Sequence, residues 1–147
     1  MPRKFAAPLA ATLGAALILA LAGFSVADDE SPLEKQMEVI NAKTKTIKNA
    51  TKTLVAWKKD SKSVIKAGEE ISRLGKEAKK EKGPAEQQKK TYAEWTKLMD
   101  DMIKASDDLV ALASQPNTPQ PDAKAAFNKL NKSCSDCHAV FRVDEEK

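Results

Sequence analysis

Two cysteines and the only histidine of this chain stand together near its C-terminus, in the sequence Cys134-Ser-Asp-Cys137-His138. On a helix these three side chains are neighbours, because residues three and four positions apart lie on one face. A Cys-x-x-Cys-His motif is typical of c-type haem attachment, in which the two thiols bond to the two haem vinyl groups. The imidazole of the adjoining histidine is then an axial ligand of the iron. The motif therefore predicts one covalently attached haem c.

Three other uses of the motif fit the sequence less well. A structural zinc site normally takes four Cys or His ligands, and this chain has two Cys and one His. A thioredoxin-like redox pair would lie near a βαβ unit, and no strand is expected here. A disulfide between Cys134 and Cys137 would close only a very small loop and would add little stability. Haem attachment is therefore the preferred interpretation.

The residues around the motif are expected to form helices. Good helix formers such as Lys, Glu, Ala and Leu dominate the 147 residues, whereas Gly occurs five times and aromatic residues make up 5%. Apolar residues recur at spacings of three and four, the period of an amphipathic helix. The expected helices span about 32–50, 51–80, 84–114 and 122–143. Joined by short connections, they predict an all-α, antiparallel up-down-up-down four-helix bundle.

Local signals support these boundaries to different degrees. Ser31 can cap the first helix, and Pro32 suits a first helical position. Gly83 followed by Pro84 predicts a firm break before the third helix. Three prolines between 115 and 121 separate the third helix from the fourth. The boundary after Ala50 is the weakest, because the residues around it are only mild helix breakers.

The inward faces carry small residues and aromatic residues. The face of the second helix includes three small residues, Ser61, Gly68 and Gly75. We expect them to admit a bulky group, such as the haem. The aromatic residues predicted to lie in the core are Trp57, Tyr92 and Trp95.

The N-terminal segment has the layout of an export signal. Arg3 and Lys4 precede an apolar run over 6–24, which ends in Ser-Val-Ala at 25–27 and is followed by acidic residues. This pattern predicts a secretory signal peptide over 1–27 and a haem domain over 28–147. Left uncleaved, the same segment would be a membrane anchor. Either way the haem domain is expected in the periplasm.

The charge pattern excludes one class of partner. The formal net charge is +4, and lysines alternate with acidic residues along the chain. A mixed pattern of this kind covers a solvated helical surface and is unlike the basic stripe of a nucleic-acid-binding protein. We therefore expect no nucleic-acid partner.

The C-terminal pattern extends beyond the motif to Phe141 and Arg142. The string Cys-x-x-Cys-His-x-x-Phe-Arg, on the last helix of a bundle, resembles the class II cytochromes c, the cytochrome c prime family. The resemblance implies that Arg142 lies along the haem edge and pairs with a propionate. Alternatively, Arg142 serves only as a positive charge that interacts favourably with the C-terminal end of the helix dipole. Members of this family are often dimers through their first two helices, so a homodimer is a further expectation.

The first helix suggests a second axial ligand. Leu33-Glu34-x-x-Met37-Glu38-x-x-Asn41 is similar to the opening helix of the periplasmic four-helix cytochromes b, in which the Met binds the iron. The resemblance implies that Met37 is the sixth ligand, although the haem of those relatives is not covalently held and the middle of the chain departs from them. In an antiparallel bundle the start of the first helix lies beside the end of the last. Met37 and His138 are therefore expected at similar depths.

Other ligands and functions are less favoured. Met99 and Met102 lie near the middle of the third helix and are expected to fill the core. With Met37 and His138 on the iron, the expected function is electron transfer between redox partner proteins, and not enzymatic catalysis. The alternative is a five-coordinate haem that binds nitric oxide or carbon monoxide, with Met37 as a pocket or core residue.

Overall fold

The computed structural model describes residues 31–142, so the predicted signal peptide over 1–27 lies outside the described residues. The helices are α1 (Pro32–Thr51), α2 (Leu54–Ala78), α3 (Gly83–Gln87), α4 (Tyr92–Ala113) and α5 (Gln120–Phe141). No strand occurs within 31–142, and the prediction of an all-α bundle is confirmed. No helix in this part of the chain has the length and apolar character needed to cross a bilayer.

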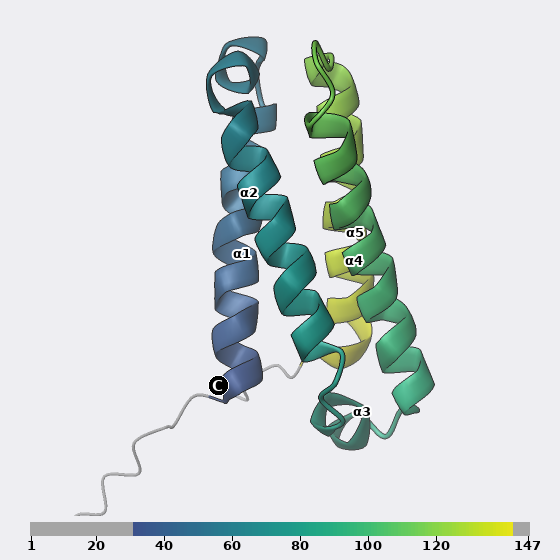
Figure 1. The fold of residues 1–147 in the computed structure, drawn as a ribbon. Coiled ribbons are helices and arrows are strands. Elements are labelled where there is room, and N and C mark those ends of the chain that lie inside the picture. Colours follow the sequence, from purple (N-terminus) through teal and green to yellow (C-terminus); the bar gives the residue numbers. More distant parts are fainter. Residues whose placement is uncertain (1–30, 143–147) are drawn as a thin grey trace, which may run out of the picture.

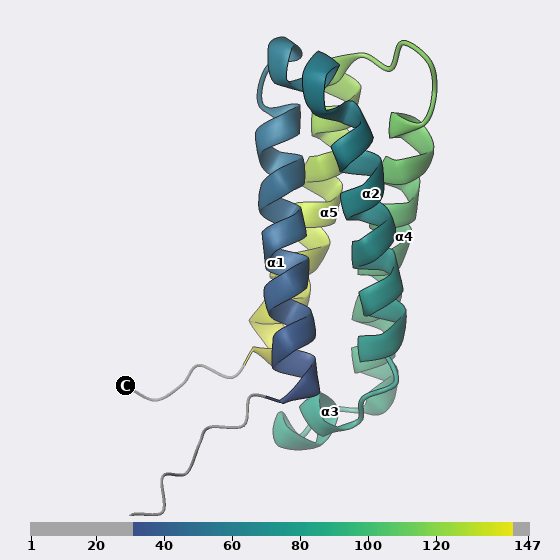
Figure 2. The same cartoon turned by 60° about the vertical axis from the view of Figure 1, so that its left-hand side comes forward.

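The four long helices run alternately up and down (Figures 1 and 2). Each long helix packs closely against the next long helix of the chain, which pairs α1 with α2, α2 with α4 and α4 with α5. The contact between α1 and α5 closes the bundle and is the least extensive of the four. One seam of the bundle is therefore looser than the other three.

The N-terminal ends of α1 and α4 are set by the same capping motif. The Ser31 hydroxyl accepts a hydrogen bond from the Glu34 backbone N–H at 3.2 Å, and the Ser31 N–H donates to the Glu34 carboxylate at 2.6 Å. Thr91 and Glu94 form the same reciprocal pair at the start of α4. Such a box satisfies backbone donors that the first helical turn leaves unpaired. The predicted cap at Ser31 is confirmed.

The predicted third helix over 84–114 is wrong in its first part. The structure has a short α3, then a turn with Lys89 at a φ of +52°, and then α4. A left-handed residue ends a helix because the next peptide can no longer bond in the helical pattern. The Thr91-x-x-Glu94 capping box marks the true start of the long helix. The boundary between the first two helices is also shifted, because Thr53 caps α2 by accepting from the Ala56 N–H at 3.2 Å.

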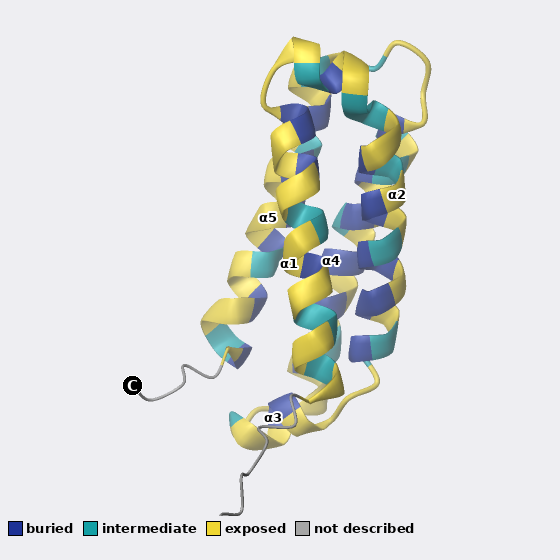
Figure 3. Cartoon of the chain, turned by 90° about the vertical axis from the view of Figure 1, so that its left-hand side faces the viewer, coloured by how far each residue is buried: buried dark blue, intermediate teal, exposed yellow. Residues whose placement is uncertain are grey.

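The core follows the expected helical faces (Figure 3). Side chains with at most 2% exposure include Ile47, Val64, Ile71, Leu109 and Leu130. All four long helices contribute to this core. The packing therefore fixes how the helices are rotated about their own axes.

The small residues of α2 serve a different purpose from the predicted one. A Cβ atom at Gly75 would lie 2.8 Å from Met102 Cε and 2.9 Å from Ile103 Cγ1, so α4 occupies the space. The Ser106 hydroxyl of α4 donates to the Gly68 carbonyl oxygen at 2.8 Å. Close approach of α2 and α4 requires these glycines, and the expectation that they admit the haem is wrong.

Candidate haem site

The haem motif lies near the C-terminal end of α5, and its three side chains differ in exposure. Cys137 is 6% exposed and belongs to the core, whereas Cys134 is half-buried against that core. His138 is exposed. Consecutive helical residues point about 100° apart, so His138 is turned from the core toward the edge of the bundle. The three side chains span an arc from core to surface, and not one inward face.

The electrostatics of the motif keep all three groups neutral near pH 7. Burial raises the pKa of the Cys137 thiol to about 11, with a smaller effect of Cys134. Burial also raises the pKa of Cys134. Burial, and then the positive charge of Arg142, lowers the pKa of His138. Neutral imidazole is the form that binds a metal. Neither thiol is in a disulfide.

A groove between α1 and α5 shows which sides of these helices face each other. The residues lining it are Lys48, Asn49 and Thr51 of α1, Lys52 just after it, and Lys124, Phe127 and Asn128 of α5. The Gln120 side-chain amide, at the start of α5, donates to the Thr51 carbonyl at the end of α1. The two helices are therefore antiparallel, and Lys48 and Phe127 line the same groove.

Helical periodicity relates both Met37 and His138 to this groove. Met37 comes eleven residues before Lys48 in α1, and His138 comes eleven residues after Phe127 in α5. Eleven residues are about three helical turns, or about 16 Å, so each residue returns to the side of its helix that faces the groove. Met37 is half-buried and packs against the core. This equal spacing agrees with the expectation of similar depths, which stays a prediction.

The sequence of this bundle was compared with protein families. The model of the family described as Cytochrome C' matches residues 33–142. The chain belongs to the cytochrome C' family. The match runs from the first turn of α1 to the end of α5, and so includes Met37 and the whole haem motif. Comparisons with curated proteins and with solved structures gave no significant match.

Family membership makes the chain a c-type haem cytochrome, with haem c as its covalent cofactor. The residues present fit this group. Cys134, Cys137 and His138 would hold the haem on α5, and Met37 is half-buried on α1. The half-buried apolar residues of these two helices include Leu33 and Met37 of α1 and Cys134 of α5. They leave apolar surface that a haem of this cytochrome could cover.

Unpaired polar atoms provide a second test of the fit. Three buried side-chain atoms of the described residues have no hydrogen-bond partner, namely Gln36 Oε1, Ser72 Oγ and Trp95 Nε1. Each lies in the half of its helix that is nearest to the motif end of the bundle. Buried polar groups in native proteins are nearly always paired. The unmet hydrogen bonds therefore gather at the end of the bundle that carries the haem motif.

The two rival methionines occupy the core, as predicted. Met99 is 1% exposed and Met102 is 3% exposed. The methyl group of Met102 lies against Gly75 of α2, so its side chain contributes to helix packing. Of the three methionines among the described residues, Met37 alone is half-buried.

Arg142 follows the last residue of α5. Its backbone N–H donates to the His138 carbonyl oxygen at 3.1 Å, and its side chain is exposed. The guanidinium is close enough to His138 to lower the pKa of that imidazole. The structure thus places Arg142 beside the haem motif, where the resemblance implies contact with a propionate.

The aromatic predictions are correct for both tryptophans and wrong for Tyr92. Trp57 and Trp95 are 5% and 2% exposed, whereas Tyr92 is 40% exposed. The Tyr92 hydroxyl donates to the Lys79 carbonyl oxygen at 2.9 Å, and the Lys82 ammonium lies 5.9 Å from the ring centre. Tyr92 therefore joins the α2–α3 connection to the start of α4. The sequence could not reveal this role, because it depends on the break after α3.

Proposed function

We propose that this cytochrome carries electrons through a low-spin haem c with His138 and Met37 as its axial ligands. Family membership supports a haem electron carrier or gas binder and does not distinguish the two. What supports electron transfer is that Met37, half-buried on α1, and His138 on the antiparallel α5 are each eleven residues from the groove that these helices share. Haem iron with imidazole and thioether ligands is coordinatively saturated and exchanges one electron, and the thioether raises its reduction potential.

The chain contributes position and environment to this reaction. Cys134 and Cys137 hold the macrocycle to α5 by two thioether bonds, and His138 follows them on the same helix. Met37 brings its sulfur from α1, so the iron would join the two helices whose direct contact is the least extensive. The exposed side of His138 leaves one edge of the site near the surface, where a redox partner protein can approach.

The alternative is a five-coordinate haem that binds nitric oxide or carbon monoxide. The sparse contact between α1 and α5 supports this function, because a less extensive contact leaves more room between these helices. Met37 would then be a pocket residue beside an open iron position. The ligands and covalent attachment on α5 would be the same in both cases.

Absorption spectroscopy of the purified holoprotein distinguishes these functions. For the electron carrier, we expect a weak sulfur-to-iron band in the near-infrared when oxidised and sharp visible bands when reduced. Carbon monoxide should not change the reduced spectrum. A high-spin spectrum together with ready binding of carbon monoxide would favour the gas-binding function.

Export to the periplasm and self-association belong to the same proposal. The segment over 1–27 supports export, and its cleavage can be measured as the mass of the mature chain. Exposed apolar side chains at Val39 of α1, and at Leu54 and Val55 of α2, support a homodimer through the first two helices. Sedimentation of the holoprotein, compared with a Val55→Lys variant, tests this contact.

A further inference from the structure

Trp95 is a buried hydrogen-bond donor that no group of the described chain satisfies. Its side chain is 2% exposed, and its indole N–H has no partner. Leaving a buried donor unpaired costs about 1–3 kcal/mol, because the group loses its hydrogen bonds to water. A residue that only filled space here could be Phe or Leu at no such cost. The indole N–H at this position therefore points to an acceptor that the polypeptide does not supply.

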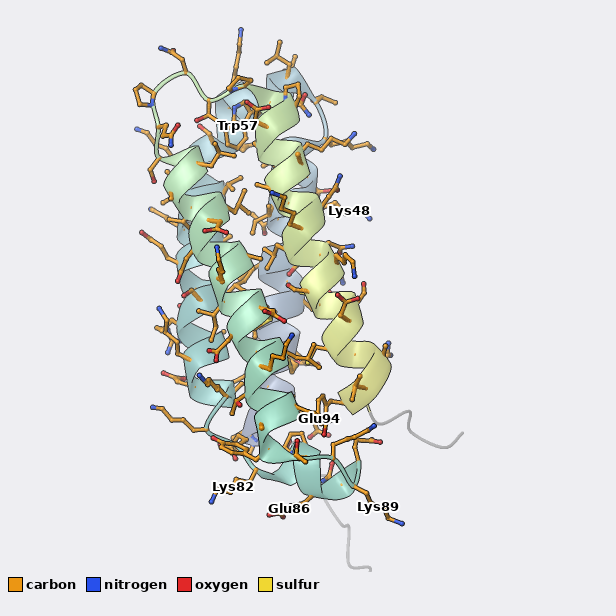
Figure 4. The ribbon with its side chains drawn as sticks, turned by 90° about the vertical axis from the view of Figure 1, so that its right-hand side faces the viewer. Lys48, Trp57, Lys82, Glu86, Lys89 and Glu94 are labelled. Carbon is orange, nitrogen blue, oxygen red and sulfur yellow. The ribbon has the colours of Figure 1, made fainter. Side chains whose placement is uncertain are left out.

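The other tryptophan shows the usual arrangement. The Trp57 indole N–H donates to the Thr118 carbonyl oxygen at 2.8 Å. Figure 4 labels Trp57 at one end of the bundle and Glu94, which precedes Trp95, at the other. The two tryptophans can thus be compared directly, because the described chain supplies a hydrogen-bond acceptor to the indole N–H of Trp57 and none to that of Trp95.

Trp95 also lies next to the helix that carries the haem motif. Its ring meets the ring of Phe141 edge to face, with 5.2 Å between the ring centres. Phe141 follows His138 by three residues on α5, so it lies on the neighbouring turn of the same helix. The unpaired donor is consequently at the same end of the bundle as the motif.

We propose that Trp95 donates its indole N–H to a haem propionate. The inference rests on the proposed haem site. The periphery of haem c consists of methyl groups, thioether links and two propionates, and the four pyrrole nitrogens are bound to iron. The carboxylates are therefore the strong acceptors that this cofactor brings, and a hydrogen bond to a charged acceptor is stronger than one between neutral groups. Trp95 would orient one propionate and fix how the haem is rotated about its attachment to α5.

A pair of substitutions tests the hydrogen bond. Trp95→Phe keeps an aromatic ring and removes the N–H, and Trp57→Phe makes the same change at the opposite end. Both variants and the wild type are purified as holoproteins, and covalent haem is verified by mass. In resonance Raman spectra, the propionate bending frequency should shift downward in Trp95→Phe and remain unchanged in Trp57→Phe. The reduction potential should fall in Trp95→Phe alone, because a less compensated propionate charge stabilises the oxidised iron.

A measurement on the wild type makes the test independent of how well the variants fold. With ¹⁵N-labelled tryptophan, the Trp95 indole N–H signal should shift as the propionates titrate, and the Trp57 signal should not. An unchanged propionate frequency in Trp95→Phe, or an indole signal indifferent to this titration, would overturn the inference even though haem is present. A shift confined to the iron–carbon monoxide stretching frequency would overturn it in favour of a donor to iron-bound gas. Wild-type protein without covalent haem would overturn the proposed haem site as well.

Discussion

Met37 and His138 belong to antiparallel helices and are each eleven residues, or about three helical turns, from a residue of one shared groove, Lys48 on α1 and Phe127 on α5. The two residues are 101 positions apart in the chain and belong to the first and last helices. Their relationship follows from helical geometry and from the antiparallel register, and the following predictions begin from it.

Replacing Met37 should open the iron. In Met37→Ala we expect loss of the near-infrared sulfur-to-iron band, a lower reduction potential, and binding of carbon monoxide by the reduced protein. The measurement is absorption spectroscopy of both oxidation states, with and without carbon monoxide. Met99→Leu is the matched control, because this buried methionine can be replaced by a residue of similar volume at a cost below about 1.5 kcal/mol. A spectrum altered by the control and not by Met37→Ala would contradict the assignment.

Removing the two thiols should make the haem dissociable. In the double variant Cys134→Ala, Cys137→Ala, the ligands His138 and Met37 remain, so we expect a b-type cytochrome whose haem is extracted by acid-acetone. The single variant Cys134→Ala keeps one thioether and should retain its haem. Mass spectrometry of the wild type should give the chain from about Asp28 plus one haem, if the expected cleavage occurs. Haem extracted from the wild type would disprove covalent attachment.

A methyl group at Gly75 should destabilise the α2–α4 contact. The added Cβ would lie 2.8 Å from Met102 Cε and 2.9 Å from Ile103 Cγ1, and overpacking of this kind costs about 1–3 kcal/mol. Alanine has a higher helix propensity than glycine, which offsets about 1 kcal/mol of this cost. The net loss in unfolding free energy is therefore about 1 kcal/mol. Gly83→Ala is the control, because nothing lies within 4 Å of its new methyl group. Equal denaturation midpoints for the two variants would show that the packing is more tolerant than this.

Acid should weaken the capping box of α4. Hydrogen bonds from the backbone N–H and then the hydroxyl of Thr91 lower the pKa of Glu94 below its usual 4.5. A lowered folded pKa stabilises the fold above the unfolded value, and this contribution disappears as the pH falls through the folded value. The difference in melting temperature between wild type and Glu94→Gln should therefore be largest near pH 7 and should shrink below about pH 4.5.

The control for this prediction is Glu81→Gln, at an exposed position between α2 and α3. This variant measures the effect of removing one surface carboxylate that does not cap a helix. A Glu94→Gln difference that is constant from pH 7 to pH 3 would mean that the carboxylate charge does not contribute to the cap.

Without haem, the bundle should loosen unevenly. The α1–α5 contact is the least extensive, and the unpaired polar atoms gather at the motif end. In haem-free protein, we expect faster hydrogen exchange in the first half of α1 and the last half of α5 than at the Gly68–Ser106 contact. Mass spectrometry of exchanged peptides from the apo and holo forms measures this. Uniform loosening, or none, would contradict a haem between these two helices.

Local chemistry explains what the sequence could predict. The cap at Ser31, the proline-rich break before α5 and the spacing of the haem motif all depend on residues within a few positions of one another. The features that could not be predicted depend on distant partners. Lys89 adopts a left-handed conformation, which a lysine in the sequence does not indicate. Gly75 must be small because Met102 and Ile103 of α4 lie close to it.

The candidate site divides in the same way. Cys134, Cys137 and His138 could be identified from spacing alone, because one helix carries all three. Met37 could be singled out only through the resemblance of its helix to a family in which Met binds the iron. The groove that α1 shares with α5 was not visible in the sequence. The unpaired N–H of Trp95 has no counterpart in the sequence, since an absent hydrogen bond is a property of the packed structure.

All the residues of the attachment motif belong to α5, and this arrangement has a mechanical consequence. Under the proposed ligation, an outward movement of α1 on its short connection to α2 would leave the haem on α5 and would remove only the Met37 sulfur from the iron. The iron–sulfur bond would then join α1 to α5, and it could break while the haem remains attached. Partner docking or mild denaturant would therefore break the bond between the iron and the Met37 sulfur before it affects the thioether bonds. A carrier built in this way can be turned into a gas binder by a rigid movement of a single helix.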